Sequence, residues 1–498
     1  MSLAHNFPFF TILLCLLAGV VTSVLKPRAA KYLTLLVSLV VLVLSAATLV
    51  LTLRLESSYS FMMGHFPAPW GNEIRIGRLE ALMATGFSAV LFITLVAGLY
   101  HMPMFVSQKK FSLYCIMVDL ALASVLVMLY TNDLFTAYVF IEIITIASCA
   151  LVIVRQNGPT LVAATRYLIM NLLASGLVLL GIAMLYGITG HLLMEPLQEA
   201  VREIYQTGNY AQPLTVVIAL ITVGLAIKSA LFPFHAWAPD TYAFGPPMSS
   251  AILSGIISKA YIFLLIKFFY RVIGFDIIRQ SHIDDFLFYC GVAGMIMGSV
   301  MAISQRDIRR MVAYSSVAQI GYVYMGLGMA SMAGVAAALF QMLAHSAAKS
   351  LLFLSTHELV SVSGNHKRFH SLHGAGYRNV AAGIVFTVSA MSMVGIPFTG
   401  GFIAKLYLAS AAIPLGGGMR VLVLVALAVS TLLNAVYFLH TVVSIYRRPA
   451  EDVLYPPAHH IPRYVVAALF VSMLMTVYLG IGSGPIMRVI ESGLKMFA

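Results

Sequence analysis

The chain has 498 residues, of which 60% are hydrophobic and only 10% carry a charge, and its formal net charge is +12. Water-soluble domains have roughly 25% charged residues, so this composition excludes a soluble globular protein of this size. The sequence therefore predicts a polytopic membrane protein whose surface faces lipid over most of its area.

About fourteen mainly apolar segments follow one another along the chain, and each is long enough to cross a bilayer as an α-helix of about 20 residues. The expected fold is all-α. The predicted transmembrane helices are residues 7–25, 32–53, 79–100, 111–130, 134–154, 162–189, 213–232, 246–270, 286–304, 308–330, 334–361, 379–413, 421–446 and 464–487.

The seventh and twelfth predicted helices should be broken. The seventh runs into Pro233, and the twelfth contains Pro397 between Gly395 and Gly400. Proline removes a backbone donor and clashes with the preceding turn, so each helix must kink or unwind there.

The basic residues of the loops predict the orientation. Most of them, including Lys26, Arg28 and Lys31, follow odd-numbered helices, and none precedes the first apolar run. This pattern favours a retained first helix over a signal peptide. By the positive-inside rule the basic side is cytoplasmic, so both termini are expected on the outer side of a prokaryotic cell membrane. The positive charge thus indicates topology and not nucleic-acid binding.

An internal repeat is also predicted. Each copy has five helices, an odd number, so the second copy would be inverted relative to the first, as in many ion-coupled transporters. A shift of 174 residues aligns three residue pairs, Asp133 with Asp307, Asn171 with His345, and Gly190 with Gly364. The predicted units are residues 1–105 (three N-terminal helices), 106–275 (first repeat), 280–448 (second repeat) and 449–498 (C-terminal helix).

Ionisable residues lie well inside several apolar segments, where a charge costs about 2.5–3.5 kcal/mol on insertion scales. Such residues usually mark ion pathways. The candidate proton-carrying residues are Glu142, Lys228, Lys259, His345 and Lys405, with Lys349 as a further candidate.

Glu142 is expected to pair with Lys228, so that making or breaking the pair switches the lysine between holding and releasing a proton. His345 suits a relay, because imidazole titrates near neutral pH. The alternative is that these groups are static contacts between helices. Lys267 is expected to extend its amine to the membrane surface, and Asp119 is either a portal group or a packing partner.

No cofactor or metal is expected. The four cysteines stand alone in apolar runs, without the CxxC spacing of metal and iron–sulfur sites. His366, His370 and His373 form a single histidine run, whereas membrane di-iron enzymes need several. The run is interpreted as a solvated basic loop, with a metal-dependent membrane enzyme as the alternative.

The sequence resembles the antiporter-like subunits shared by respiratory complex I, membrane-bound hydrogenases and Mrp-type sodium/proton antiporters. The similarity covers about residues 115–410. The motifs that carry it are Phe140-Ile141-Glu142, the runs Lys228 to Asp240, Ser249 to Lys259 and Asp307 to Gly321, His345-Ser-Ala-Ala-Lys349, and Gly395 to Lys405.

The resemblance implies a proton half-channel in each repeat, with Glu142 and Lys228 as the coupling pair, Lys259 and His345 continuing a central polar axis, and Lys405 as the terminal site. It also implies other integral membrane subunits as partners, and protons or also Na⁺ as the transported ion. Lysine at 405 and the short C-terminal segment are more similar to N-type complex I and D-type Mrp subunits than to M-, L- or A-types. A stand-alone transporter for a small organic solute is the alternative.

Overall fold

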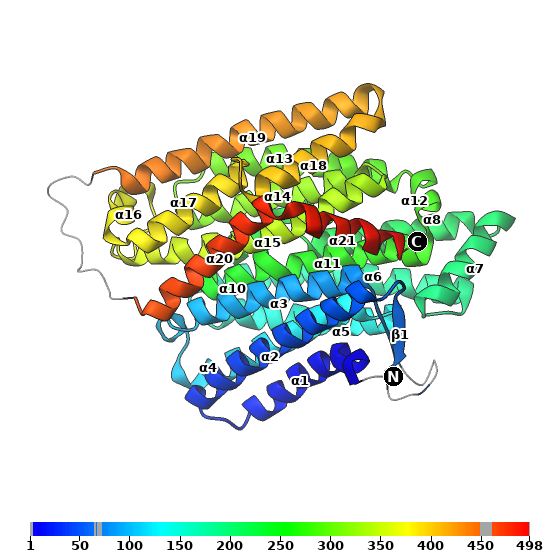
Figure 1. Ribbon diagram of the computed structural model, residues 1–498, viewed down its shortest axis with the longest axis horizontal. Helices are drawn as coiled ribbons and strands as arrows, with labels where there is room; N and C mark the ends of the chain where they lie inside the picture. The colour runs from blue at the N-terminus through cyan, green and yellow to red at the C-terminus, as the bar shows by residue number, and fades with distance from the viewer. Residues whose placement is uncertain (1–2, 64–65, 67–71, 449–460, 498) are drawn as a thin grey trace.

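The computed structural model describes residues 3–63, 66, 72–448 and 461–497. Helices make up nearly all of this part of the chain (Figure 1), and its only sheet is a hairpin of β1 (Tyr59–Met62) and β2 (Glu73–Ile76). The expectation of an all-α fold is therefore confirmed.

The first half of the chain contains the following helices. They are α1 (Phe7–Thr22), α2 (Pro27–Arg54), α3 (Arg78–Gly98), α4 (Gln108–Tyr130), α5 (Leu134–Ile153), α6 (Gly158–Thr189), α7 (Met194–Thr207), α8 (Ala211–Lys228), α9 (Ala238–Phe244), α10 (Pro247–Ile252) and α11 (Ser258–Phe268), with short turns η1 (Leu3–Asn6), η3 (Met102–Met104) and η4 (Phe234–Trp237).

The second half continues in the same way. Its helices are α12 (Phe275–Gln280), α13 (Ile283–Ile303), α14 (Ile308–Gly328), α15 (Met332–Ser361), α16 (Ala375–Arg378), α17 (Val380–Val394), α18 (Gly400–Ala412), α19 (Gly417–Tyr446), α20 (Arg463–Ile481) and α21 (Ser483–Lys495), with short turns η7 (Phe369–Leu372) and η8 (Ile413–Leu415).

Twelve helices of the described residues are long and apolar enough to cross a membrane. The helix α14 and the pair α17–α18, which cover the tenth and twelfth predicted spans, are not among these twelve. The count of fourteen spans therefore stays a prediction.

Both predicted helix breaks are present. The helix α8 ends at Lys228 and the chain turns through Pro233 into η4 and α9. The helix α17 ends at Val394, Gly395 takes a left-handed conformation with φ of 90°, and α18 begins at Gly400. Two further irregularities, the π-helical segments η5 (Leu253–Ile257) and η6 (Phe269–Ile273), interrupt the helix predicted at 246–270.

Equivalent residues of the two repeats have equivalent local roles. Asp133 caps the first turn of α5 and bridges to Leu193, whereas Asp307 caps α14 and bridges to Arg368. Gly190 and Gly364 both have positive φ, of 71° and 66°.

The two repeats are inverted. Thr131, just before Asp133, bridges to Ile74 of the β hairpin, at the end of the molecule that holds both termini (Figure 1). Arg368 belongs to the segment that joins α15 to α16, and α16 lies at the opposite end (Figure 1). The helices α5 and α14 therefore start from opposite ends. The exact boundaries of the units stay a prediction.

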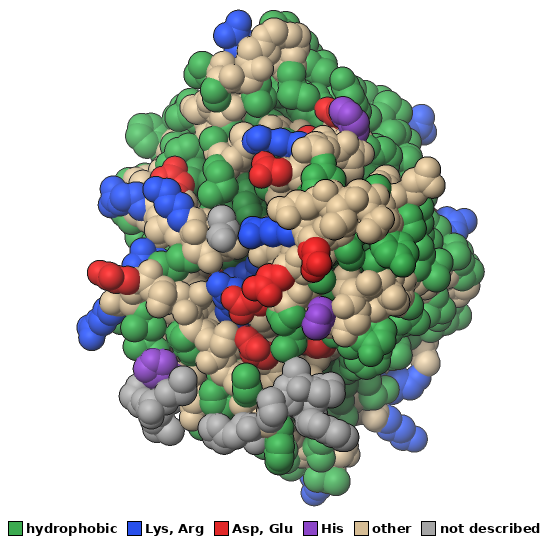
Figure 2. Space-filling model, turned by 90° about the vertical axis from the view of Figure 1, so that its right-hand side faces the viewer, with side chains coloured by type: hydrophobic (Ala, Val, Ile, Leu, Met, Phe, Trp, Pro, Cys, Tyr) green, Lys and Arg blue, Asp and Glu red, His purple; other side chains and the backbone are tan. Residues whose placement is uncertain are grey.

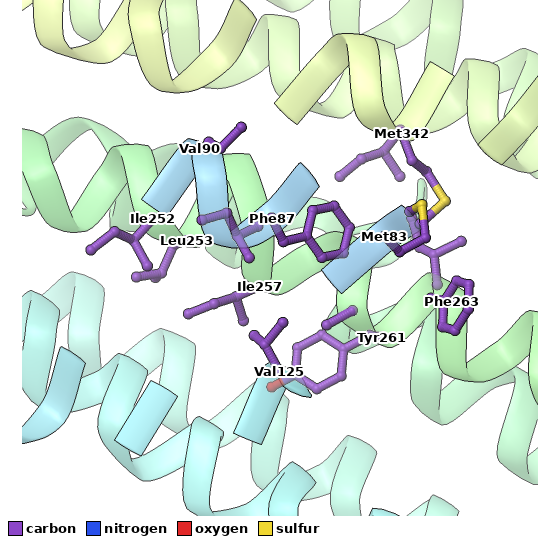
Figure 3. Close-up of a cluster of buried hydrophobic side chains, with 14 of the residues drawn as sticks. Met83, Phe87, Val90, Val125, Ile252, Leu253, Ile257, Tyr261, Phe263 and Met342 are labelled. Carbon is purple, nitrogen blue, oxygen red and sulfur yellow. The ribbon is translucent and has the colours of Figure 1, made fainter. Parts of the chain in front are cut away.

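The interior is formed by the helical run 247–273 together with α3, α4 and α15. The apolar windows of that run and of α15 are completely buried, whereas the outer helices α2, α6 and α19 expose apolar side chains to the bilayer. Figure 3 shows part of this core, with Met83, Phe87 and Val90 of α3, Val125 of α4, Ile252 and Tyr261 of the run, and Met342 of α15 packed together.

Charged side chains collect at the ends of the helices. Figure 2 looks onto the end that carries both termini, where acidic and basic side chains lie over the middle of the face and hydrophobic ones surround them. The titratable groups of the interior are therefore separate from this surface layer.

Candidate functional site

Lys228 lies in the interior at the point where α8 ends. Its side chain is 1% exposed, and the Nζ atom donates to Thr145 Oγ1 on α5 at 2.9 Å. The ring of Tyr261 on α11 lies 5.6 Å from the same amine. The broken helix thus delivers the amine directly to the face of α5.

Glu142 lies one turn before Thr145 on α5, but it forms no ion pair with Lys228. The five ion pairs among the described residues do not include Glu142, and its Oε1 atom has no hydrogen-bond partner there. The carboxylate acts on Lys228 only through longer-range electrostatics. The expected ion pair between Glu142 and Lys228 is therefore not formed in this structure, because the amine of Lys228 bonds to Thr145 instead.

Lys259, His345 and Lys349 lie together in the middle of the molecule. All three are fully buried, and their charges act on one another. Lys259 follows the π-helical segment η5 and donates to the carbonyl of Ser254. Neither ring nitrogen of His345 has a partner in the described part of the chain.

Lys349, the additional candidate, also has its amine hydrogen-bonded in the interior. Its amine donates to the carbonyl of Val312 at 2.8 Å and to the hydroxyl of Ser315, both on α14. No carboxylate of the described residues pairs with Lys259, Lys349 or Lys405. These amines are therefore solvated by neutral oxygens.

Two hydroxyl groups connect the two repeats at this level, since Ser254 and Ser316 are joined by a hydrogen bond of 2.9 Å. Within the second repeat, Gln341 on α15 donates to Gln319 on α14 at 2.7 Å. Gln341 lies four residues before His345, on the same face of α15. Polar side chains thus accompany the central lysines from one repeat into the other.

Lys405 occupies a polar pocket at the second helix break. Its amine donates to the carbonyl of Val394 at 2.7 Å, to that of Met393 at 3.3 Å and to Thr431 Oγ1 at 3.1 Å. The two carbonyls belong to the last turn of α17, where helical carbonyls have no donors of their own helix left to pair with. The ring of Tyr322 lies 5.1 Å from the amine.

The polar pocket continues outward from Tyr322. Its hydroxyl donates to Ser430 at 2.9 Å and accepts from Asn434 at 3.2 Å, and Asn434 in turn accepts from Tyr437. These side chains come from α14 and α19. The arrangement places a network of hydrogen-bonded hydroxyl and amide groups beside Lys405.

Sequence reasoning missed a charged cluster at the end of the molecule that holds the termini. Arg271 and Glu80 form an ion pair of 2.5 Å with side-chain exposures of 3% and 0%. Lys267 is fully buried beside them and donates to the carbonyls of Leu129 and Thr131. The expectation that Lys267 extends to the surface is therefore wrong, because the end of α4 supplies its acceptors.

A second missed pair joins His101, in the loop after α3, to Glu358 on α15, with Nε2 and Oε1 2.5 Å apart. The sequence signal is Glu358 itself, an acid near the end of the apolar segment 334–361.

Asp119 on α4 is 1% exposed and accepts a hydrogen bond of 3.0 Å from Thr34 on α2. This contact joins α4 to α2, and the choice between a portal group and a packing partner stays a prediction. The run of His366, His370 and His373 lies in the loop after α15, and no group of three or more metal-ligating side chains lies together in the described residues.

Comparisons with known proteins agree with this architecture. NADH-quinone oxidoreductase subunit N of Desulforudis audaxviator is 33% identical over 458 residues, which cover 89% of this chain and 87% of that protein. The D-type Na⁺/H⁺ antiporter subunit of Bacillus subtilis is 25% identical over 361 residues, or 72% of this chain and 71% of that one.

Solved structures share the fold. A chain of the Mrp complex from Dietzia sp. superimposes with a TM-score of 0.88 at 24% identity, covering 99% of this chain and 97% of that one. A chain of an archaeal membrane-bound sulfane sulfur reductase gives 0.86 at 22% identity, with coverage of 100% and 98%. Residues 131–445 match the family model described as NADH:quinone oxidoreductase/Mrp antiporter, TM, and the chain therefore belongs to this family of membrane proteins.

Proposed function

We propose that the chain is a proton-translocating, antiporter-like subunit of a multi-subunit membrane complex. The proton-carrying residues are Glu142, Lys228, Lys259, His345, Lys349 and Lys405. The observation that carries the proposal is that Lys228, Lys259, Lys349 and Lys405 are buried, have no carboxylate in contact and are held by neutral oxygens instead. A fixed amine charge is costly in such surroundings, so these groups suit proton exchange better than static cross-linking.

Lys228 is the switch of this mechanism. Thr145, which now holds its amine, and Glu142 are three residues apart on α5 and therefore face the same way. Movement of the amine from the hydroxyl to the carboxylate favours its protonated form, and return to the hydroxyl favours release. The two positions couple proton binding to a displacement at the break that follows α8.

The proton then passes through the centre of the membrane. Lys259, His345 and Lys349 form the middle of the path, and the glutamines and Tyr322 lead on to Lys405. The boundaries proposed for the two half-channels are residues 106–275 and 280–448. The relative named as a Na⁺/H⁺ antiporter subunit supports H⁺ as the ion, and its name adds Na⁺ as a candidate counter-ion.

Partner subunits supply the driving force, either by electron transfer or by an opposing ion gradient. The orientation proposed from the basic loops puts both termini on the outer side of a prokaryotic cell membrane. Both termini lie at the same end of the molecule (Figure 1), which fits an even number of crossings.

The test uses inverted membrane vesicles that contain the assembled complex, with a fluorescent dye that reports the pH gradient. Lys228→Ala and Glu142→Ala are each expected to abolish proton translocation or antiport while assembly persists. Lys109→Ala and Glu203→Ala, which remove exposed charges, are the matched controls and should transport normally. Normal transport by both Lys228→Ala and Glu142→Ala would refute the assigned roles.

A further inference from the structure

A cluster of titratable side chains lies where the loop after α3 meets the last turns of α15. His101 Nε2 and Glu358 Oε1, 2.5 Å apart, form the buried pair already described, with side-chain exposures of 10% and 5%. Both ring nitrogens of His101 are buried and make no hydrogen bond within the described residues, so the ring is free to accept one. The ring of His357 packs edge-on against that of His101, with centroids 4.9 Å apart, and its Nε2 atom has no partner among the described residues.

Two cavities meet at this cluster. The outer one has a volume of about 250 Å³ and is lined by Tyr100, His101, Met104, Glu358, Ser361 and Ile461, among others. The inner one, of about 10 Å³, lies between His101, His357, Glu358, Met248 and Leu354 and has room for about one water molecule. His101 and Glu358 line both cavities, so the pair forms the partition between them.

The cluster lies at the end of the molecule opposite the termini, where α3 and α15 reach the α16 side (Figure 1). This is the end that carries the basic loops. The charged groups that act on His357 there are His101, Arg309 of α14 and Arg155 after α5. The two arginines donate to the carbonyls of residues 245 and 244, and the charge of Asp307 acts on Arg309. Glu358 is the acid in contact with His101.

The cluster is connected to the central lysines by a single helix. His357 follows Lys349 by eight residues on α15, a rise of about 12 Å. The ring of Phe353 lies between them in sequence and within 6.0 Å of the Lys349 amine. The neighbouring α14 carries Ser315, which accepts from Lys349. A proton that reaches the inner cavity is therefore two helical turns from the proposed path.

We propose that His101, Glu358 and His357 form the mouth through which protons move between the water at the basic end and Lys349. His101 takes a proton from the outer cavity at one ring nitrogen and gives the proton of the other nitrogen to Glu358. The proton then moves from Glu358 through the inner cavity and past His357 toward Lys349, and a turn of the His101 ring brings its remaining N–H back to face Glu358. An imidazole ring has two nitrogens, one of which can bind a proton while the other releases one, which suits exchange in both directions. This inference rests on the proposed function.

The first experiment measures proton translocation by the assembled complex in oriented vesicles. Glu358→Gln and His101→Gln keep polar side chains of similar size but remove the exchange of a proton within the pair. Each is expected to lower the transport rate by about tenfold or more, with normal assembly. His282→Gln and Asp285→Asn, from an exposed ion pair of 3.0 Å, are the matched controls and should be unaffected.

Lys228→Ala, measured in parallel, separates the two proposals. Loss of transport in Lys228→Ala but not in Glu358→Gln or His101→Gln would overturn the mouth and leave the function standing. Normal transport in all three would overturn the function as well.

A second measurement covers the case in which Glu358→Gln does not assemble. Ser361→Cys places a thiol in the outer cavity, where a membrane-impermeant thiol reagent should block transport only from the side of the basic loops. The wild type is the control, since its four cysteines are buried or half-buried. Absence of modification from that side, or full transport after modification, would each overturn the proposal.

Discussion

The buried pair of Glu80 and Arg271 makes the stability of this membrane protein sensitive to a single charge. Glu80 is paired with Arg271 and its charge also acts on Lys267, while the charges of Arg75 and Glu195 act on Arg271 as well. The remaining nitrogens of Arg271, Nε and Nη1, have no partner among the described residues, and its guanidinium rests on the ring of Phe497 at 3.9 Å. Glu80→Gln should therefore remove the main compensating charge from two buried cations, Arg271 and Lys267.

The magnitude follows from the geometry. Two unit charges about 4 Å apart interact by about 4 kcal/mol at an effective dielectric constant of about 20. Removing one partner of a buried pair costs about 3–5 kcal/mol in proteins, and we expect that loss for Glu80→Gln. Glu80 also accepts the backbone N–H of Gly77 at 3.1 Å, a cap that glutamine retains. Glu80→Ala loses this cap too, for about 1 kcal/mol more.

The assay is thermal unfolding in detergent, followed with a thiol-reactive dye that detects Cys15 and Cys115 when they become exposed. The control is Arg166→Gln, which breaks an ion pair whose arginine is 60% exposed and should cost less than about 1 kcal/mol. The expected order of melting temperatures, from highest to lowest, is Arg166→Gln, then Glu80→Gln, then Glu80→Ala. If Glu80→Gln melts together with Arg166→Gln, the reasoning about the buried pair fails.

Two further predictions concern a glycine and a lysine outside the proton path. A Cβ atom at Gly401 would overlap the carbonyl oxygen of Ser392, so Gly401→Ala should force α18 away from α17. This variant should reduce both the amount of assembled complex, measured by immunoblot, and proton transport in vesicles. Gly418, which has open space around it, is the control, and Gly418→Ala should change neither. Burial and nearby arginines lower the pKa of Lys367, in the loop after α15, to about 8. Between about pH 8 and 10.5 the unfolded chain therefore binds more protons than the folded one, so the stability of the wild type should rise with pH relative to that of Lys367→Met. Melting curves at several pH values will measure this difference.

Hydropathy and proline were sufficient to predict most of the fold. Long apolar runs specified the main helices, and Pro233 and Pro397 specified the breaks, because both signals act locally. The amphipathic helix α7 was missed, since only Met194, Leu197 and Val201 are buried in an otherwise polar segment. The π-helical segments were missed because a change in hydrogen-bond register leaves no trace in hydropathy.

The candidate site was partly predictable for a similar reason. A lysine in the middle of an apolar run must be buried, and Lys228, Lys259 and Lys349 are. A lysine near the end of an apolar run can either be buried or extend its amine to water, and the side chains and carbonyls packed around it determine which occurs. Lys267 is buried because the end of α4 offers two carbonyls, which a single sequence does not reveal.

The open contact between Glu142 and Lys228 was beyond sequence reasoning as well. Opposite charges in apolar segments predict attraction, but the competition from Thr145 depends on the exact rotation of α5. The sequence indicates which groups can meet, and the packing decides which contact is made in a given state.

Interrupted helices provide main-chain solvation for cations in this protein. Lys405 is coordinated by Met393 and Val394 at the end of α17, and Lys267 by Leu129 and Thr131 at the end of α4. A continuous helix keeps its carbonyls for its own ladder, so straightening α17 into α18 would remove the dipoles that replace water around the amine. Each buried amine therefore depends on the helix end beside it, and a substitution that made the helix continuous would be as harmful as one that removed the lysine.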